Sequence, residues 1–321
     1  MSTAVMTDSF RAMGCRVDVF VVGGNASHHG LVRDSLVRLE QRWSRFIPTS
    51  DISRINAAAG VPVEVDPCTV ELVTAMVHGW AATDGAFDPT LLAPLVGLGY
   101  AASWDDPSAV TSIAPHTSMR GDPAAIELDP AGRIVRVPQG TALDAGGIGK
   151  GLAADMTVAA LLAHGAAGAL VSVGGDLRAS GRPPTDAGWS VGVADPFDDS
   201  VNQAHLMLMD AGVATSGTVN RAWLDPAGKR VHHLLDPRTC APVGAHLGDE
   251  VIEATVIAGS AAWAEVFAKA VLVNGPRLMF PRLDSMGLGA RVVSADGSAR
   301  TNECWNAFSS EHGARSAEGE S

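Results

Sequence analysis

Alternating apolar and polar residues predict short strands at several places along the chain. The segment RVDVFVV at residues 16–22 has apolar residues at nearly every second position, which is typical of a strand with one buried face. Two shorter runs, 126–128 and 133–137, flank DPAGR and are interpreted as a hairpin. The remaining predicted strands are 168–173, 189–194, 205–209 and 251–258.

Apolar residues at helical spacing predict helices at 31–46, 69–82, 148–164 and 260–272. Residues 51–56 are interpreted as a short polar segment. Residues 101–125, which are rich in Asp, Pro and Ser, are interpreted as a surface loop. Helices and strands alternate in places while hairpins intervene in others, so the pattern favours an α+β or mixed α/β fold over a regular doubly wound sheet.

Length and charge narrow the class of protein. A chain of 321 residues with 46% hydrophobic residues is long enough for two lobes or for one large domain with a sizeable core. Its 35 acidic and 23 basic residues give a net charge of -12. This balance argues against nucleic-acid binding as the main function, but it leaves room for a nucleotide in a locally positive pocket.

The sequence also predicts a reduced, cytoplasmic protein. The first fifteen residues lack the apolar core of a secretory signal. No run of about 18 apolar residues suggests a membrane span. The cysteines lie far apart and form no CxxC pair, which argues against a zinc knuckle and against a dense disulfide framework. They are Cys15, Cys68, Cys240 and Cys304.

The densest glycine signal is LDAGGIGKGLAAD at residues 143–155. A phosphate-binding P-loop needs Ser or Thr after its lysine, whereas Gly151 follows Lys150 here. The glycine spacing does not fit a dinucleotide-binding fingerprint either. A glycine turn leading directly into a helix still presents free N–H groups at the positive end of a helix dipole, which suits a pyrophosphate. A tight turn needed only for packing is the alternative.

Two further glycine-containing stretches carry weaker signals. In LVSVGGDLRASG, Gly174, Gly175 and Asp176 follow a predicted strand, where glycines allow either close backbone approach to a ligand or a hairpin turn. In ATSGTVNRAW, Ser216 precedes a glycine and is a possible nucleophile, but the G-x-S-x-G elbow of a hydrolase is absent.

His233 and Asp88 each have two interpretations. His233 is a candidate general acid or base because the ordinary histidine pKa lies near neutrality, or it hydrogen-bonds a loop backbone. Asp88 stands before Pro89, so it either caps the following helix or meets the polar edge of a ligand.

Taken in order, eight stretches of the chain resemble the ApbE family, the FAD:protein FMN transferases. The resemblance covers roughly residues 11–276. Its blocks are RAMGC, RWSRFIPTSDISRIN, GAFDPT, LDAGGIGKGLAAD, VSVGGDLRASG, ATSGTVNR, HHLLDPRT and ATVIAGSAAWAEVFAKAVLVNG. It implies a two-lobed, T-fold-like α+β protein that binds FAD between its lobes. It also implies an enzyme that, with Mg²⁺, transfers FMN to a Ser or Thr of an acceptor protein and releases AMP.

The resemblance also implies site residues. The flavin-binding candidates are Met13, Phe46, Ala86, Phe87, Asp88, Asp144, Lys150 and Leu234, to which we add Gly174, Gly175, Asp176 and Ser216. Phe46 offers an aromatic face to a flat ring, and Lys150 offsets phosphate charge. His233 and Lys269 are the catalytic candidates, and Gly147 and Glu265 are the metal candidates.

The metal position departs from the family pattern. The block aligned with residues 264–270 reads A-D-A-x-A-T-A in the family, and its Asp and Thr bind Mg²⁺ with a backbone carbonyl that corresponds to Gly147. Glu265 stands at the Asp position and Lys269 at the Thr position. Glu265 keeps a carboxylate, whereas a protonated Lys269 has only donors. Either the metal remains with fewer protein ligands, or Lys269 takes over part of its charge.

Other interpretations remain open from the sequence. Glu265 and Lys269 form either part of a site or an ordinary exposed salt bridge of about 0.3–0.5 kcal/mol. The chain is alternatively an FAD pyrophosphatase or a non-catalytic flavin-binding protein. We expect a flexible segment at 1–10, one domain formed by 11–276 and 277–308, and a disordered tail at 309–321.

Overall fold

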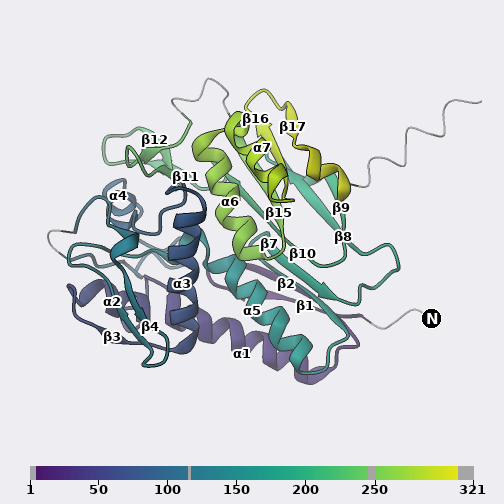
Figure 1. Cartoon of the computed structure of the whole chain (residues 1–321), viewed down its shortest axis with the longest axis horizontal. Helices are drawn as coiled ribbons and strands as arrows, with labels where there is room; N and C mark the ends of the chain where they lie inside the picture. The colour runs from purple at the N-terminus through teal and green to yellow at the C-terminus, as the bar shows by residue number, and fades with distance from the viewer. Residues whose placement is uncertain (1–4, 115–116, 245–250, 310–321) are drawn as a thin grey trace, which may run out of the picture.

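An eight-stranded antiparallel sheet forms the centre of the computed structural model, which describes residues 5–114, 117–244 and 251–309 (Figure 1). Along the sheet the strands are β1 (Val5–Ala12), β2 (Cys15–Val22), β6 (Gly168–Val173), β7 (Asp176–Gly181), β10 (Ala211–Gly217), β15 (Val251–Ala258), β16 (Gly289–Ser294) and β17 (Ala299–Thr301). The apolar positions of the segment at 16–22 follow the pleat of β2, so Val17, Val19 and Val21 are fully buried.

One face of this sheet is covered by helices α1 (Ala26–Trp43), α5 (Gly149–Ala163) and α6 (Ala261–Asn274) (Figure 1). Helix α6 lies against β10 and β15 on one side and against α5 on another. Because it is covered on several sides, it is apolar around most of its circumference and almost entirely buried. Helix α7 (Pro276–Ser285) follows it and packs beside β16.

The opposite face of the sheet is covered by the hairpin β8 (Trp189–Asp195) and β9 (Asp198–Leu208). Trp189, Leu206 and Leu208 are buried in an apolar cluster with residues of β6, β7 and β10. The short helix η3 (Glu303–Ala307) adds Trp305 to this cluster. The central strands β6, β7 and β10 are therefore largely buried on both faces.

A second, smaller lobe holds α2 (Asp51–Ala57), α3 (Pro67–Ala82), α4 (Leu92–Gly97), η1 (Pro123–Ala125) and a three-stranded sheet (Figure 1). That sheet has the order β3 (Val63–Glu64), β5 (Ile134–Arg136) and β4 (Glu127–Asp129). Short helix η2 (Ala145–Gly147) leads from this lobe into α5. Two small hairpins follow β10 in the sequence: β11 (Ala222–Leu224) with β12 (Arg230–His232), and β13 (Leu235–Asp236) with β14 (Ala241–Pro242).

The α+β class expected from the sequence is confirmed, and each predicted strand and helix corresponds to an observed element. Some details differ. Residues 51–56 form helix α2, because Ser50 accepts a hydrogen bond from the Ser53 N–H as its N-cap. Helix α1 begins at Ala26 rather than residue 31, because Asn25 and His28 form a capping box. Asp88 does not cap α4, whose N-cap residue is Leu91.

The ends of the chain and its cysteines complete the comparison. Residues 5–10, expected to be flexible, belong to β1 and pair with β2 along their whole length. Residues 1–4 and 310–321, the outer parts of the expected flexible ends, lie outside the described residues, while Ser309 bridges Leu206.

All four cysteines are free thiols, as their spacing predicts. No helix in the described part of the chain combines the length and apolar character needed to cross a membrane.

Candidate active site

A cavity of about 390 Å³ lies between the two lobes and gathers most of the predicted site residues. Eleven of the sixteen candidates line it: Met13, Phe46, Ala86, Phe87, Asp88, Asp144, Gly147, Lys150, His233, Leu234 and Lys269. The other five do not: Gly174, Gly175, Asp176, Ser216 and Glu265. Asp176, Ser216 and Glu265 lie behind the cavity surface, where they contact the two lining lysines.

Gly174 and Gly175 lie in a tight backbone turn. They form the two-residue turn of the β6–β7 hairpin, with φ values of 62° and 94°. Positive φ at both positions is the requirement of a type I′ turn, which glycine meets without strain. The expectation that these glycines bind the flavin therefore gains no support, and the hairpin interpretation is confirmed.

A buried cluster of four charges forms the floor of the cavity. Lys150, from the first turn of α5, pairs with Asp176 at the start of β7 and lies 3.6 Å from Glu265 Oε1. Lys269 Nζ lies 3.2 Å from the same oxygen. Asp176 is 1% exposed and Glu265 is 0% exposed. An ordinary exposed salt bridge is thus excluded for Glu265 and Lys269.

Opposite charges outweigh burial at Lys150 and Glu265, whereas burial raises the pKa of Asp176 and lowers the pKa of Lys269. Burial favours the neutral form of each group, but Asp176 and Glu265 together raise the pKa of Lys150 above its ordinary value. Burial likewise acts to raise the pKa of Glu265, and the ammonium groups of Lys269 and Lys150 outweigh it and hold the pKa below the ordinary value. Glu265 is therefore a carboxylate that two lysines share.

The surroundings of Glu265 do not fit Mg²⁺. Its Oε2 accepts the Gly151 N–H at 2.9 Å, and its Oε1 is the oxygen that faces Lys269. A hard cation of this kind prefers several oxygen ligands in near-octahedral geometry. Within residues 5–114, 117–244 and 251–309, no three His, Cys, Asp or Glu side chains are grouped so as to hold a metal ion. The metal role predicted for Gly147 and Glu265 gains no support from this geometry.

The opposite end of the cavity is aromatic. The Tyr100 ring lies 6.1 Å from Phe46, 6.2 Å from Trp104 and 5.4 Å from Trp223, measured between ring centroids. The buried Arg45 guanidinium stands over the Phe46 ring at 4.3 Å and over the Tyr100 ring at 4.6 Å. Its Nε lies 3.6 Å from Asp144 Oδ1. A flat ligand ring can stack here against aromatic faces.

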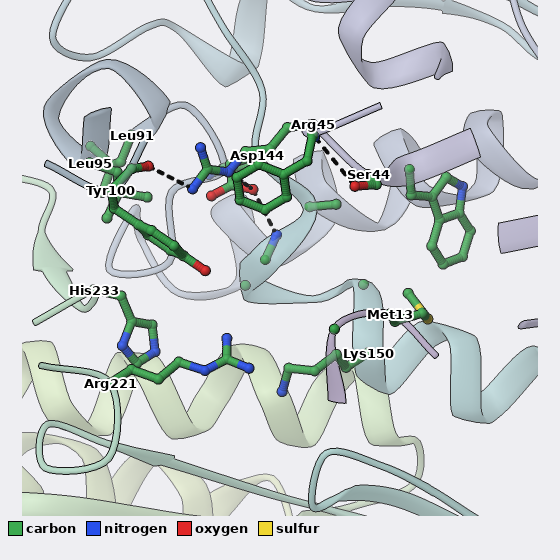
Figure 2. Close-up of a pocket in the computed structure, with 18 of the residues that line it drawn as sticks. Met13, Ser44, Arg45, Leu91, Leu95, Tyr100, Asp144, Lys150, Arg221 and His233 are labelled. Atoms are coloured by element: carbon green, nitrogen blue, oxygen red, sulfur yellow. Dashed lines mark hydrogen bonds and ion pairs between the residues drawn. The ribbon is translucent and has the colours of Figure 1, made fainter. Parts of the chain in front are cut away.

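His233 and Arg221 stand beside the lysines. Figure 2 shows Arg221 and Lys150 extending toward each other along one wall, with His233 next to Arg221 and with Tyr100, Arg45 and Asp144 on the opposite wall. Burial, together with Arg221 and Lys269, lowers the pKa of His233 to about 3. Its imidazole is therefore neutral near pH 7.

Asp88 and Asp144 act chiefly as structural acceptors at the edge of the cavity. Asp88 Oδ1 accepts from the Thr90 N–H at 2.8 Å, and its Oδ2 accepts from Arg120 Nε at 2.6 Å. Asp144 accepts from the Gly146 N–H at 3.1 Å and so caps η2, the short helix before α5. These bonds shape the two loops that close one side of the cavity.

Among the lining residues that sequence reasoning missed are Tyr100, Trp104 and Arg221. Residues 101–125 are assigned to a surface loop by their composition. Tyr100 directly precedes this segment, and Trp104 lies within it. Arg221 ends the stretch ATSGTVNR, whose pattern drew attention to Ser216 instead. The only available signals were an aromatic pair in a polar loop and a basic residue just after a glycine turn.

The cavity lies in an antiparallel α+β scaffold and has aromatic rings at one end and cations at the other. This arrangement defines a protein that binds a flat ligand with negative charge. This chain belongs to the ApbE family, whose family model matches residues 13–289. It is 30% identical over 287 residues to an FAD:protein FMN transferase of Treponema pallidum. This match covers 81% of this chain and 76% of that protein.

Other relatives agree. An FAD:protein FMN transferase of Rhodobacter capsulatus is 29% identical over 264 residues, and the match covers 80% of this chain but only 48% of that protein. The chain thus spans about half the length of that relative. Among solved structures, the ApbE protein of Thermotoga maritima gives a TM-score of 0.81 at 26% identity, over 95% of this chain and 99% of that one. The apo flavinyl transferase ApbE of Pseudomonas stutzeri gives 0.77 at 26% identity, over 96% and 98%.

Proposed function

We propose that this chain is an FAD:protein FMN transferase, which cleaves the FAD diphosphate and attaches FMN to a Ser or Thr hydroxyl of an acceptor protein. The observation that carries the proposal is the cavity, in which Lys150, Arg221 and Lys269 face the space beside the aromatic end. We call these three residues the cationic wall. A diphosphate joined to two ring systems matches this division, and the curated relatives carry the same activity in their names.

The chemistry assigns a role to each part of the site. The acceptor hydroxyl oxygen attacks the phosphorus of the FMN half, a new phosphoester bond forms, and the bond from that phosphorus to the bridging oxygen breaks, which releases AMP. The neutral His233 accepts the hydroxyl proton and returns it to the leaving phosphate. Lys150 and Arg221 donate to the phosphate oxygens, where negative charge develops.

The proposed function also involves a possible metal ion, an acceptor molecule and a cellular location. The resemblance implies Mg²⁺, but the donor set at Glu265 does not fit it, so no step is assigned to a metal. The acceptor is a protein, as in the names of the curated relatives, and the resemblance implies a Ser or Thr hydroxyl on it. The cytoplasmic location expected from the sequence stays a prediction, and the four free thiols are consistent with it.

The experiment combines purified protein, FAD and a panel of acceptor domains, with FMN in place of FAD as the control. Transfer gives a fluorescent acceptor band, an acceptor mass increased by FMN, and AMP in equal amount. Free FMN and AMP in a sample without acceptor indicate an FAD pyrophosphatase. FAD that stays bound and intact with every acceptor indicates a binding protein. Either of these last results would overturn the proposal.

A further inference from the structure

The Lys269 side chain occupies the space between Glu265 and Gly147. Its Nζ lies 3.2 Å from Glu265 Oε1 and 3.3 Å from the Glu265 carbonyl oxygen, and 3.5 Å from Ser216 Oγ. Its stem runs along Gly147, where an added Cβ would come within 3.4 Å of Lys269 Cε and 3.6 Å of Cδ. A cation on Glu265 that also reached Gly147 would overlap with this side chain.

We propose that the Lys269 ammonium is a resident cation that takes the place of a divalent metal at this site, so that the protein binds the diphosphate of FAD without metal. The inference rests on the proposed function, because it names the group that meets the diphosphate. It concerns binding, however, and holds or fails independently of whether FMN is then transferred.

The position of Lys269 is fixed by its helix. Residues four apart lie on one face of a helix, so Glu265 and Lys269 meet within α6. The α6 backbone is buried between the sheet and α5, and Glu265 is held in turn by the Gly151 N–H. The Lys269 side chain is 14% exposed, and this exposed part lines the cavity. The ammonium is therefore preorganised toward a ligand.

The charges around the site favour an anion over a second cation. The two ammonium groups balance the carboxylates of Glu265 and Asp176, so these four groups carry no net charge. Arg221 adds a positive charge, and its guanidinium has no ion pair or hydrogen bond among the described residues. The five groups together therefore carry a net charge of +1, which repels a divalent cation and attracts an anion.

The choice of lysine is itself informative. Only three of the 23 basic residues are lysines, and the chain otherwise uses arginine. Two of the three, Lys150 and Lys269, share the carboxylate of Glu265. Lysine carries a compact point charge, which fits the volume of a small metal ion better than the flat guanidinium of arginine does. The third, Lys229, is exposed and supplies a matched control.

The test measures FAD affinity by quenching of flavin fluorescence, in EDTA and in Mg²⁺. For the unmodified protein we expect dissociation constants within twofold of each other. Lys269→Met should weaken binding at least tenfold in both buffers. Lys269→Thr should weaken binding in EDTA and regain most of the loss with Mg²⁺, because it removes the ammonium and frees Glu265 Oε1. Lys229→Thr should change neither value.

A second readout follows metal directly. Mn²⁺ titration monitored by electron paramagnetic resonance should show no bound ion in the unmodified protein and one in Lys269→Thr, and far-ultraviolet circular dichroism confirms that each variant is folded. If Lys269→Met does not fold, Lys269→Arg replaces it as the second variant, because it keeps the charge. The inference is overturned if Mg²⁺ strengthens FAD binding tenfold or more in the unmodified protein, if that protein binds no FAD in either buffer, or if it binds Mn²⁺. Loss of FMN transfer with metal-independent FAD binding intact would overturn only the proposed function.

Discussion

Gly151 donates its backbone N–H to Glu265 Oε2 at 2.9 Å, which joins the first turn of α5 to the first half of α6 beneath the cavity. The two helices approach very closely here. A Cβ added at Gly151 would lie 2.4 Å from the Ala261 carbonyl oxygen and 2.7 Å from the Ala262 nitrogen. Because both obstacles are backbone atoms, only glycine allows this contact without a shift of a helix.

We therefore expect Gly151→Ala to lower the free energy of unfolding by about 1–3 kcal/mol and to weaken FAD binding, because the displaced helix carries Glu265 and Lys269. Gly30→Ala in α1 is the matched control. No atom lies within 4 Å of its added Cβ, so it should be neutral or stabilise by about 0.5–1 kcal/mol. Urea unfolding measures both variants, and equal stabilities would contradict the close contact.

The sequence predicts α6 well and its surroundings only in part. The apolar residues of SAAWAEVFAKAVL predict the helix, and the spacing of Glu265 and Lys269 predicts that they meet. The burial of that pair depends on β10, β15 and α5, which lie far away in the sequence. Whether a charged pair is exposed or buried is decided by such tertiary packing, so the helix alone leaves both interpretations open.

The same limit explains the site residues that were missed. A motif identifies residues whose backbone must adopt a special conformation, such as Gly174 and Gly175 in the β6–β7 turn. Tyr100, Trp104 and Arg221 reach the cavity from loops, and the direction of a loop side chain depends on the rest of the fold. The family resemblance implies candidate residues that line the cavity, but it does not indicate Tyr100, Trp104 or Arg221.

His233 should be the proton acceptor in the proposed transfer. We expect His233→Asn to lower kcat by about 10²–10⁴-fold, with FAD affinity changed little, because its ring contributes no charge to the cationic wall. Burial, Arg221 and Lys269 lower its pKa to about 3, so the imidazole stays neutral from pH 8 down to pH 5. The pH profile of kcat/KM should show no histidine limb near neutrality. A limb near the ordinary histidine pKa that disappears in His233→Asn would show that the His233 pKa is not lowered, whereas an unchanged kcat in His233→Asn would contradict its role as proton acceptor.

The Tyr100 ring should provide stacking energy for one ring system of FAD. Tyr100→Ala is expected to weaken FAD binding by roughly 5–150-fold, which corresponds to about 1–3 kcal/mol of stacking. Tyr100→Phe keeps the ring and should bind within about twofold of the unmodified protein. Phe197→Ala removes an exposed aromatic residue in the β8–β9 turn and serves as the control. Equal FAD affinities for the two Tyr100 variants, measured by calorimetry, would show that the ring does not stack.

The Lys150 and Asp176 pair should be mutually dependent. Lys150→Met leaves the buried Asp176 without its main partner, and loss of one member of a buried pair costs about 3–5 kcal/mol of stability. Combining Lys150→Met with Asp176→Asn removes both charges and should restore at least half of the loss. Urea unfolding of the single and double variants gives the coupling energy. Additive losses would mean that the two side chains do not interact.

Glu253 should make the stability of the protein depend on pH. The side chain is 6% exposed, and burial raises its pKa to about 7, although Arg291 acts in the opposite direction. A carboxyl whose pKa is higher in the folded state holds its proton more tightly there, so its contribution to stability is complete below pH 4.5 and is lost as the pH rises to about 7. Glu253→Gln should therefore unfold like the unmodified protein near pH 4.5 and be more stable at pH 8, by at most roughly 3 kcal/mol.

Glu127→Gln changes an exposed carboxylate of β4 and should leave the pH dependence unaltered. Urea unfolding at both pH values makes the comparison, and a Glu253→Gln variant that is less stable than the unmodified protein at pH 8 would show that the charged form is favoured in the folded state.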